Sequence, residues 1–198
     1  MDSISLFVSN VLKFFFLFTP FFALAMFLSM TEGKTDAERR ALAHRIAVAT
    51  VVIAAALLYC GPFIFRIFGI TVDAFRIGGG VLLMLTAISF THPKHLAGPT
   101  DDNFTVVPLA MPVIVGPAAG SAIMVSATEL SGFFEKALGF AALITALTLI
   151  WGILLLATWF EHILGKRGLA IMMRLSGLIL AALSAQMVMT GVVNFMKP

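Results

Sequence analysis

Three things are scarce in this sequence: cysteine, charge and the features of a cleaved leader. Cys60 is the only cysteine, which excludes an intrachain disulfide and a metal site made of several cysteines. Charged residues are 12% of the chain, whereas soluble domains carry roughly 25%. A formal net charge of only +3, with no basic stripe interleaved with aromatics, argues against a nucleic-acid partner. The chain is therefore predicted to be an integral membrane protein.

Two further absences concern the start of the chain and catalysis. Residues 1–5 lack the positive region and the small-residue cleavage site of a signal peptide, so the first apolar run is expected to stay as a helix. The four histidines are dispersed, and no serine, histidine and acid are arranged for nucleophilic catalysis. The sequence thus predicts no enzyme, no metal site and no cofactor.

Apolar length is what the chain has in abundance. Hydrophobic residues make up 60% of its 198 residues, and the mean hydropathy is +1.04. This length suits a single membrane domain over 1–198. Six runs approach the roughly 20 residues that a helix needs to cross a bilayer. They extend over 6–30, 41–62, 74–90, 104–128, 137–160 and 169–195, with a polar loop over 92–103. The predicted fold is all-α with six transmembrane spans.

Basic residues near the span ends predict the orientation. Seven lie in the loops that follow the first, third and fifth spans, and four lie on the opposite side. Because basic loops stay in the cytoplasm, both termini are predicted to lie outside. The seven are Lys34, Arg39, Arg40, Arg45, Lys94, Lys166 and Arg167, and the four are Lys13, Arg66, Lys136 and Lys197.

The fourth run is an unusual transmembrane segment. It holds three prolines and two glycines within thirteen residues: Pro108, Pro112, Gly116, Pro117 and Gly120. An interior proline removes a helix hydrogen bond and clashes with the preceding turn. In lipid, the freed backbone groups need protein or a water-filled cavity as partners. The sequence therefore predicts a broken helix, and such a break at membrane depth indicates a site.

The two halves of the chain resemble each other. Residues 19–32 align with 116–129 at an offset of 97, and both copies keep the proline and end in Ser-x-Thr-Glu. Residues 76–87 align with 174–185 at an offset of 98. Two matches at nearly one offset indicate duplication. The predicted repeats extend over about 1–92 and 104–198, and three spans per repeat make the second copy inverted in the membrane.

Each repeat begins with a predicted break that starts a half-helix. Proline suits the first helical position, and Thr19 is a plausible N-cap before Pro20. The free N–H groups and positive dipole ends of the two half-helices are predicted to hold a substrate carboxylate. The alternative is that both breaks are kinks packed on neighbouring helices. The predicted substrate-binding residues are Thr19, Pro20, Phe21, Phe22, Ala23, Gly116, Pro117, Ala118, Ala119, Gly120 and Ser121.

Two arginines occupy matching positions in the repeats. Burying an arginine in a membrane costs at least about 2.5–3.5 kcal/mol, so each needs a partner. Asp73 lies three residues before Arg76 on one helix face and is its predicted partner. Arg174 has no acid within one turn. Their shared position favours a role in bracing the broken helices, and direct contact with a substrate carboxylate is the alternative.

Smaller features have mostly structural interpretations. The run Gly78-Gly79-Gly80 indicates close helix packing. Thr86 and Ser184 match in the repeat and either hydrogen-bond across helices or line a pocket. Ser126 lies near a span end, where a capping or loop role is favoured over ligand contact. Lys13 is expected to snorkel or to face the cavity.

The motifs resemble those of the MarC family of bacterial and archaeal inner-membrane proteins, which includes the SnatA small neutral amino acid transporters. The resemblance covers nearly the full chain and rests on residues 20–31, 68–70, 74–83, 108–112 and 116–117. Thr19-Pro20-Phe21-Phe22 departs from the family pattern Asn-Pro-Ile-Gly, and Gly-Pro-Ala-Ala replaces Gly-Pro-Gly-Ala in the second copy. The departure removes a side-chain amide and adds a ring at the first half-helix start.

Together these patterns predict a secondary transporter in the plasma (inner) membrane, with alternating access about a midplane site. The resemblance implies glycine and alanine as substrates, and a coupling ion would be H⁺ or Na⁺. Membrane lipid is the predicted surrounding partner, and a homo-oligomer is compatible with the sequence. A passive channel for a small solute and a non-transporting scaffold subunit are the alternatives.

Overall fold

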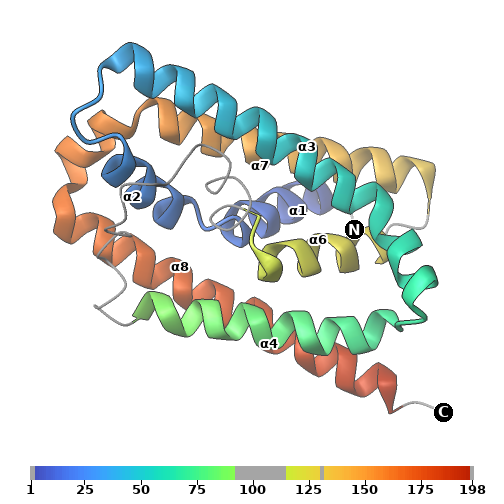
Figure 1. Ribbon diagram of the computed structural model, residues 1–198. Helices are drawn as coiled ribbons and strands as arrows, with labels where there is room; N and C mark the ends of the chain where they lie inside the picture. The colour runs from blue at the N-terminus through green and yellow to red at the C-terminus, as the bar shows by residue number, and fades with distance from the viewer. Residues whose placement is uncertain (1–2, 92–114, 130–131, 197–198) are drawn as a thin grey trace.

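The computed structural model describes residues 3–91, 115–129 and 132–196, and all the elements it describes there are helices (Figure 1). This confirms the predicted all-α class over the described part of the chain. Pro108, Pro112 and the whole predicted polar loop over 92–103 lie outside the described residues. The helices are α1 (Ser3–Leu17), α2 (Pro20–Met30), α3 (Asp36–Phe68), α4 (Val72–Thr91), α6 (Pro117–Glu129), α7 (Phe133–Leu155) and α8 (Ala157–Phe195).

Four helical segments in the described part are long and apolar enough to cross a membrane: Asp36–Phe68, Val72–Phe90, Phe133–Leu155 and Arg167–Phe195. The bent pair α1 and α2 makes a fifth if it is counted as one span. By itself α6, with 13 residues, is about 20 Å long, shorter than the roughly 30 Å hydrocarbon core. The first part of the fourth predicted span lies outside the described residues, so a total of six spans remains a prediction.

The boundaries of two predicted spans differ from the structure. Helix α3 continues through Pro62 to Phe68, although the second run was expected to end at this proline. The fifth run was expected to reach Phe160, but its helix ends at Leu155 and α8 begins at Ala157. Apolar character continues across this junction, and hydropathy alone therefore did not reveal the change of helix.

The predicted break at Thr19-Pro20 is present. Thr19 has φ 49° and ψ 60°, in the left-handed region, and the axes of α1 and α2 differ by 41°. Pro20 begins α2, and the Ala23 N–H donates to the Thr19 carbonyl at 3.0 Å. The Thr19 side chain makes no capping hydrogen bond. The backbone of this residue, rather than its hydroxyl, therefore forms the helix start.

We expect Thr19→Asn to stabilise the protein. A β-branched residue is strained in the left-handed region, which asparagine tolerates better, and relief of about 1 kcal/mol corresponds to a rise in Tm of about 2–4 °C for a chain of this size. Thermal unfolding of the detergent-solubilised protein measures the change. Thr35→Asn is the matched control, because Thr35 is an N-cap in the extended region. A Thr19→Asn variant that melts at or below the wild-type temperature would contradict the strain argument.

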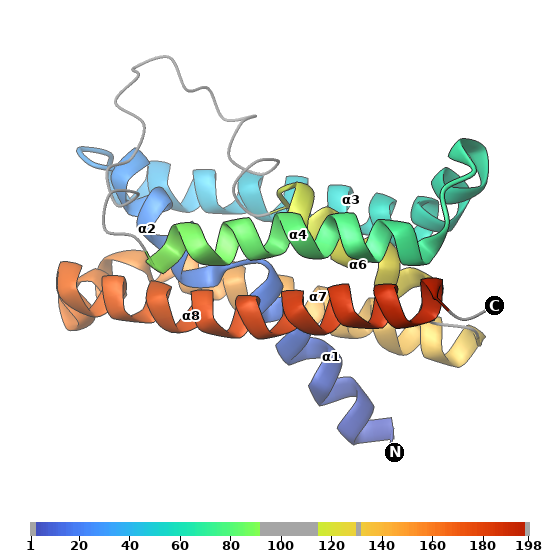
Figure 2. The same ribbon diagram turned by 90° about the horizontal axis from the view of Figure 1, so that it is seen from below.

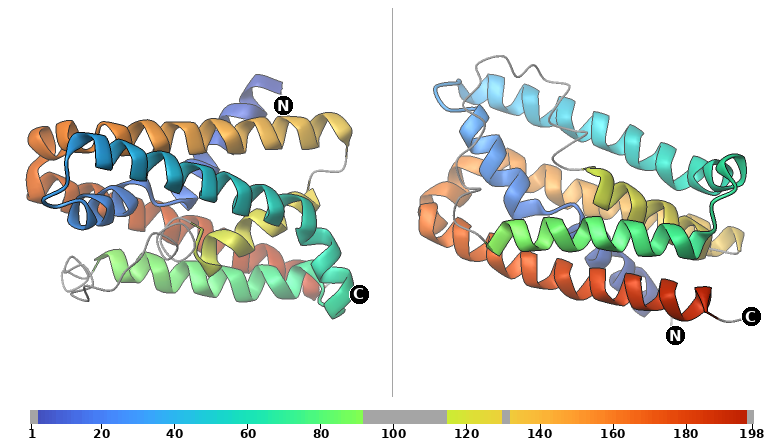
Figure 3. Two further views of the ribbon diagram at one scale, coloured as in Figure 1. Left: turned by 45° about the horizontal axis from the view of Figure 1, so that its top comes forward. Right: turned by 60° about the horizontal axis from the view of Figure 1, so that its bottom comes forward.

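The short helices lie between two layers of long ones. Helices α3 and α7 form one layer, α4 and α8 lie side by side in the other, and α2 and α6 lie between them (Figures 1 and 2). The end of α1 that joins α2 also lies between the layers, whereas its N-terminal part projects beyond the bundle (Figure 2). Figure 3 shows α6 between α3 and α4. Every residue from Ala118 to Ala127 is buried. The half-helices are thus enclosed by protein, as broken backbone at membrane depth requires.

Glycines allow α4 to approach its neighbours closely. A side chain on Gly80 would collide with Val188 of α8, and one on Gly79 would collide with Ser121 of α6. The Ser184 hydroxyl donates to the Gly80 carbonyl at 2.6 Å across the α4–α8 contact. Gly79 and Gly80 therefore have the predicted packing role, whereas nothing lies within 4 Å of a Cβ added to Gly78.

The outer surfaces of the long helices are apolar. On α3, Tyr59, Phe63 and Ile67 are more than 60% exposed, as are Val48 and Val52. Their spacing places them along the outside of the helix. Such an exposed apolar face is expected where lipid replaces water as the solvent.

Candidate functional site

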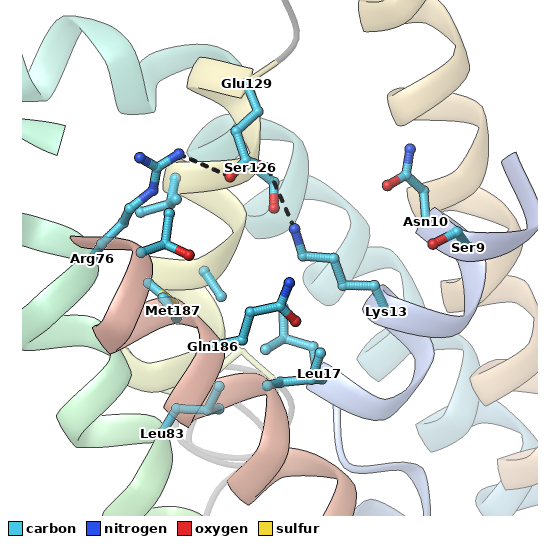
Figure 4. A pocket seen from close by; sticks show the side chains of 14 residues that line it. Ser9, Asn10, Lys13, Leu17, Arg76, Leu83, Ser126, Glu129, Gln186 and Met187 are labelled. Carbon is cyan, nitrogen blue, oxygen red and sulfur yellow. Dashed lines mark hydrogen bonds and ion pairs between the residues drawn. The ribbon is translucent and has the colours of Figure 1, made fainter. Parts of the chain in front are cut away.

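A polar cavity of about 360 Å³ lies among α1, α4, α6 and α8 (Figure 4). Its walls come from both halves of the chain. The lining residues are Ser9, Asn10, Lys13 and Leu17 of α1, Arg76 and Leu83 of α4, Ala122, Val125, Ser126 and Glu129 of α6, and Leu183, Gln186, Met187 and Thr190 of α8.

Helical spacing brings the polar side chains onto the inner face of each helix. Ser9 and Lys13 are four residues apart on α1, and Gln186 and Thr190 are four apart on α8. Residues at this spacing lie one above the other on a helix. Polar groups within transmembrane segments generally face a bundle interior or a water-filled cavity rather than lipid. The cavity is where these separate polar stripes meet.

Glu129 connects two cations at the cavity. Its Oε1 accepts from Nη2 of Arg76 at 2.9 Å, and its Oε2 lies 3.5 Å from Nζ of Lys13. Figure 4 shows Lys13 extending from α1 toward Glu129, with Gln186 beside the pair. The ion bridge therefore joins α1, α4 and α6 through one carboxylate.

Arg76 is the most enclosed member of this cluster. Its side chain is 13% exposed, against 35% for Lys13 and 45% for Glu129. Nη1 of Arg76 donates to Asp73 Oδ1 at 2.8 Å, and Asn194 Nδ2 donates to the same oxygen at 3.3 Å. The i, i+3 partner expected from the sequence is thus present, and Glu129 is a second one. The two carboxylates balance the charges of Lys13 and Arg76.

Ser126 has hydrogen-bonding capacity that the described residues leave unused. The residue is 6% exposed, and its Oγ lines the cavity without a hydrogen-bond partner in the described part of the chain. A buried hydroxyl without a partner costs roughly 1–3 kcal/mol. A water molecule or a ligand in the cavity would remove this cost. The position of Ser126 near a span end predicts a capping or loop role, whereas the structure places it on the cavity wall.

The first set of predicted binding residues lies at the α1–α2 break rather than on the cavity wall. Thr19, Pro20 and Ala23 are buried, and Phe21 and Phe22 are half-buried. The ring of Phe22 packs against that of Phe90, with centroids 4.9 Å apart. The first turn of α2 is therefore packed against the end of α4 through these two rings.

The second set lies at the start of α6. Ala118, Ala119, Gly120 and Ser121 are buried, and α6 begins at Pro117. The Gly120 N–H donates to the Gly116 carbonyl at 2.8 Å, and the Ser121 hydroxyl donates to the Ala118 carbonyl at 2.8 Å. None of the predicted residues from 116 to 121 lines the polar cavity, which begins one position further along, at Ala122.

The repeat-related arginines have different surroundings. Arg76 lines the cavity in contact with two carboxylates. Arg174 is exposed on α8 and pairs with no acid among the described residues. Matching sequence positions therefore do not give matching environments. Of these two arginines, only Arg76 lines the polar cavity.

Several cavity residues were missed or only partly found from the sequence. The Ser-x-Thr-Glu motif ends in Glu129 but assigns it no site role, and no sequence motif includes Gln186 or Asn10. Facing the cavity was one of two alternatives for Lys13. The signal that could have found these residues is the recurrence of polar side chains three or four positions apart within apolar helices.

The chain is similar to a known family of membrane proteins over nearly its whole length. The model for "MarC family integral membrane protein" matches residues 4–196. A UPF0056 membrane protein of Aquifex aeolicus is 31% identical over 97% of this chain and 94% of its own length. A counterpart from Methanocaldococcus jannaschii is 32% identical over 90% of this chain and 91% of its own. The UPF0056 membrane protein YhcE of Escherichia coli is 30% identical over 90% of this chain and 87% of its own length. No solved structure matches this chain.

Proposed function

Because this chain belongs to the MarC family of integral membrane proteins, we propose that it is a secondary transporter of small solutes, with small neutral amino acids such as glycine and alanine as substrates. The observation that carries the proposal is the polar cavity that lies among helices of an otherwise apolar bundle. Its volume of about 360 Å³ is at the low end of the roughly 300–1,000 Å³ of small-molecule sites. A cavity of this size suits a solute of few atoms.

The charges of the cavity suit a zwitterion. Arg76 and Lys13 offer donors for a carboxylate, and Glu129 offers an acceptor for an ammonium group. The hydroxyl of Ser126 and the amide of Gln186 provide neutral hydrogen-bonding groups beside them. Arginine suits carboxylate recognition because its planar fork makes two parallel hydrogen bonds. In this proposal the substrate replaces part of the ion bridge between Lys13, Glu129 and Arg76.

The proposal includes alternating access between two inverted repeats. It is supported by the equivalent places of Pro20 and Pro117, each of which begins a short buried helix. It is also supported by the pairing of like elements, with α4 beside α8 and α3 beside α7 (Figures 1 and 2). Rocking of one repeat against the other would expose a site between them to each side in turn.

The half-helix starts remain a second candidate site for the carboxylate. In their favour are the unpaired first N–H groups of a helix start and its positive dipole end. The cavity residues and the half-helix starts are separable by mutation, because the two sets share no residue. A variant at Ser126 tests the cavity, and a variant at Ala119 tests the start of α6.

We place the protein in the bacterial or archaeal plasma (inner) membrane with both termini outside. Helix α1 begins and α8 ends toward the same end of the bundle (Figures 1 and 2). Arg39, at the start of α3, donates to Thr158 of α8 at 3.3 Å, so the starts of α3 and α8, which follow two of the loops assigned to the cytoplasm or lie beside them, are in contact. This arrangement supports the orientation drawn from the basic residues.

Counterflow of labelled alanine into proteoliposomes tests the function. We expect the wild-type protein, loaded with unlabelled alanine, to accumulate label well above empty liposomes and to saturate with substrate. An imposed pH gradient or sodium gradient then identifies the coupling ion as H⁺ or Na⁺. Flux that does not saturate, with measurable conductance, would favour the channel alternative. Absence of alanine and glycine flux, together with a stoichiometric co-purifying protein, would favour the scaffold.

A further inference from the structure

A second cavity lies on the other side of the last turn of α6. Thr128 of α6 lines this cavity, whereas the adjacent Glu129 lines the polar one. We call it the basic cavity, because Arg66 of α3 and Lys136 of α7 line it and no carboxylate does. It measures about 540 Å³ and is closed on one side by the turn from α3 into α4. Its charge therefore differs from that of the polar cavity, in which Glu129 accompanies Lys13 and Arg76.

The two cations of the basic cavity have no carboxylate partner among the described residues, unlike Lys13 and Arg76 of the polar cavity. Lys13 and Arg76 each lie within 4 Å of a carboxylate, whereas Arg66 and Lys136 form no ion pair with any residue that the structure describes. Lys136 is in the first turn of α7, where the helix dipole disfavours a positive charge. A bound anion would compensate both charges.

Uncharged donors lie in the same wall. Thr71 precedes α4, and its Oγ1 accepts from the Ala74 N–H at 3.2 Å, which leaves its hydroxyl hydrogen for a ligand. Val72 also lines the cavity, and its N–H, at the start of α4, has no partner within the helix. Asp73 does not occupy this space, because its carboxylate is bonded to Arg76 and Asn194. The wall therefore combines two cations with neutral donors, a combination that suits a phosphate group.

An apolar track leads away from these donors. Tyr59 and Pro62 line a small adjoining cavity that also contacts Lys136. Tyr59, Phe63 and Ile67 then form a stripe at i, i+4 and i+8 on α3, and each is more than 60% exposed. A ligand that bridges these features needs an anionic head and an apolar tail.

We propose that the basic cavity binds an anionic phospholipid, with its phosphate on Arg66, Lys136 and the start of α4 and its acyl chains along Tyr59, Phe63 and Ile67. Basic pockets between transmembrane helices are suited to such headgroups. The lipid would join the ends of α3 and α6 to the starts of α4 and α7. The proposal does not depend on whether the polar cavity transports amino acids.

Thermal unfolding of the full chain in maltoside detergent tests it with three additives: dioleoyl-phosphatidylglycerol, dioleoyl-phosphatidylcholine and inorganic phosphate. We expect phosphatidylglycerol alone to raise the Tm, by about 5 °C. Arg66→Gln and Lys136→Gln should each weaken binding about fivefold, and the double variant about thirtyfold. Lys136→Arg should keep the effect, and Arg45→Gln, an exposed charge at the far end of α3, is the matched control.

Three results would overturn the assignment. An equal rise with phosphatidylcholine would mean that any lipid suffices. An equal response to phosphatidylglycerol in the double variant would place binding elsewhere. A rise with inorganic phosphate alone, lost in the double variant, would assign the cavity to a free phosphate rather than a lipid. Native mass spectrometry, which counts retained phosphatidylglycerol on each variant, gives an independent reading if a variant is less stable.

Discussion

Transport of alanine falls at least tenfold in Glu129→Gln, by our expectation, while the protein stays folded. Glutamine keeps the shape of the side chain but removes the charge that lies 2.9 Å from Arg76 and 3.5 Å from Lys13. Hydrogen bonds to charged groups contribute roughly 1.5–3 kcal/mol, and about 1.4 kcal/mol corresponds to a tenfold change in binding. The variant also leaves an excess of positive charge facing the substrate's ammonium group.

Initial rates of alanine counterflow, measured at several substrate concentrations, separate this effect from a loss of protein. Glu161→Gln is the matched control, because Glu161 is an exposed carboxylate in the first part of α8 and lines neither cavity. A melting temperature close to wild type shows that the bundle remains intact. Wild-type transport by Glu129→Gln would remove the polar cavity from the mechanism and leave the half-helix starts as the site.

The second large effect concerns stability and uses three neighbouring glycines. We expect Gly79→Ala and Gly80→Ala to lower the Tm by about 5–10 °C, because overpacking costs roughly 1–3 kcal/mol. A Cβ on Gly79 would lie 2.6 Å from Cβ of Ser121. A Cβ on Gly80 would lie 3.2 Å from the backbone nitrogen of Val188. Helix association in membranes depends on such close van der Waals packing.

Gly78→Ala is the matched control, because its expected change in Tm is zero or positive rather than negative. Nothing lies within 4 Å of a Cβ at Gly78, and alanine favours a helix over glycine by about 0.8–1.0 kcal/mol. Its Tm should therefore stay constant or rise, as thermal unfolding of the three single variants in one detergent will show. Equal Tm values for all three would mean that α4 is not packed as tightly against α6 and α8 as described.

Some features could be predicted because they depend on near neighbours in the chain. The break at Thr19-Pro20 follows from the missing proline N–H, and the Asp73–Arg76 pair follows from i, i+3 spacing on one helix. The membrane class follows from composition, and the family resemblance is confirmed by the match over residues 4–196. The break and the ion pair each depend on a short stretch of sequence, and the membrane class depends only on the composition of the whole chain.

The polar cavity could not be predicted in the same way. Lys13, Arg76 and Glu129 are separated by more than fifty residues along the chain, and no local rule brings them together. The sequence predicts the site at the proline breaks, because these are the irregularities that local patterns reveal. The structure places the breaks inside the packed core and the charges at one end of the bundle.

The sequence by itself therefore determined the class of protein, the position of the first break and the residues able to carry charge. The tertiary structure alone decided which charges meet, because the rotation and register of packed helices depend on contacts between distant segments. The two repeat-related arginines show the difference. Arg76 meets Asp73 and Glu129 at the cavity, whereas Arg174 is exposed on α8, so equivalent positions in the sequence have different surroundings in the packed bundle.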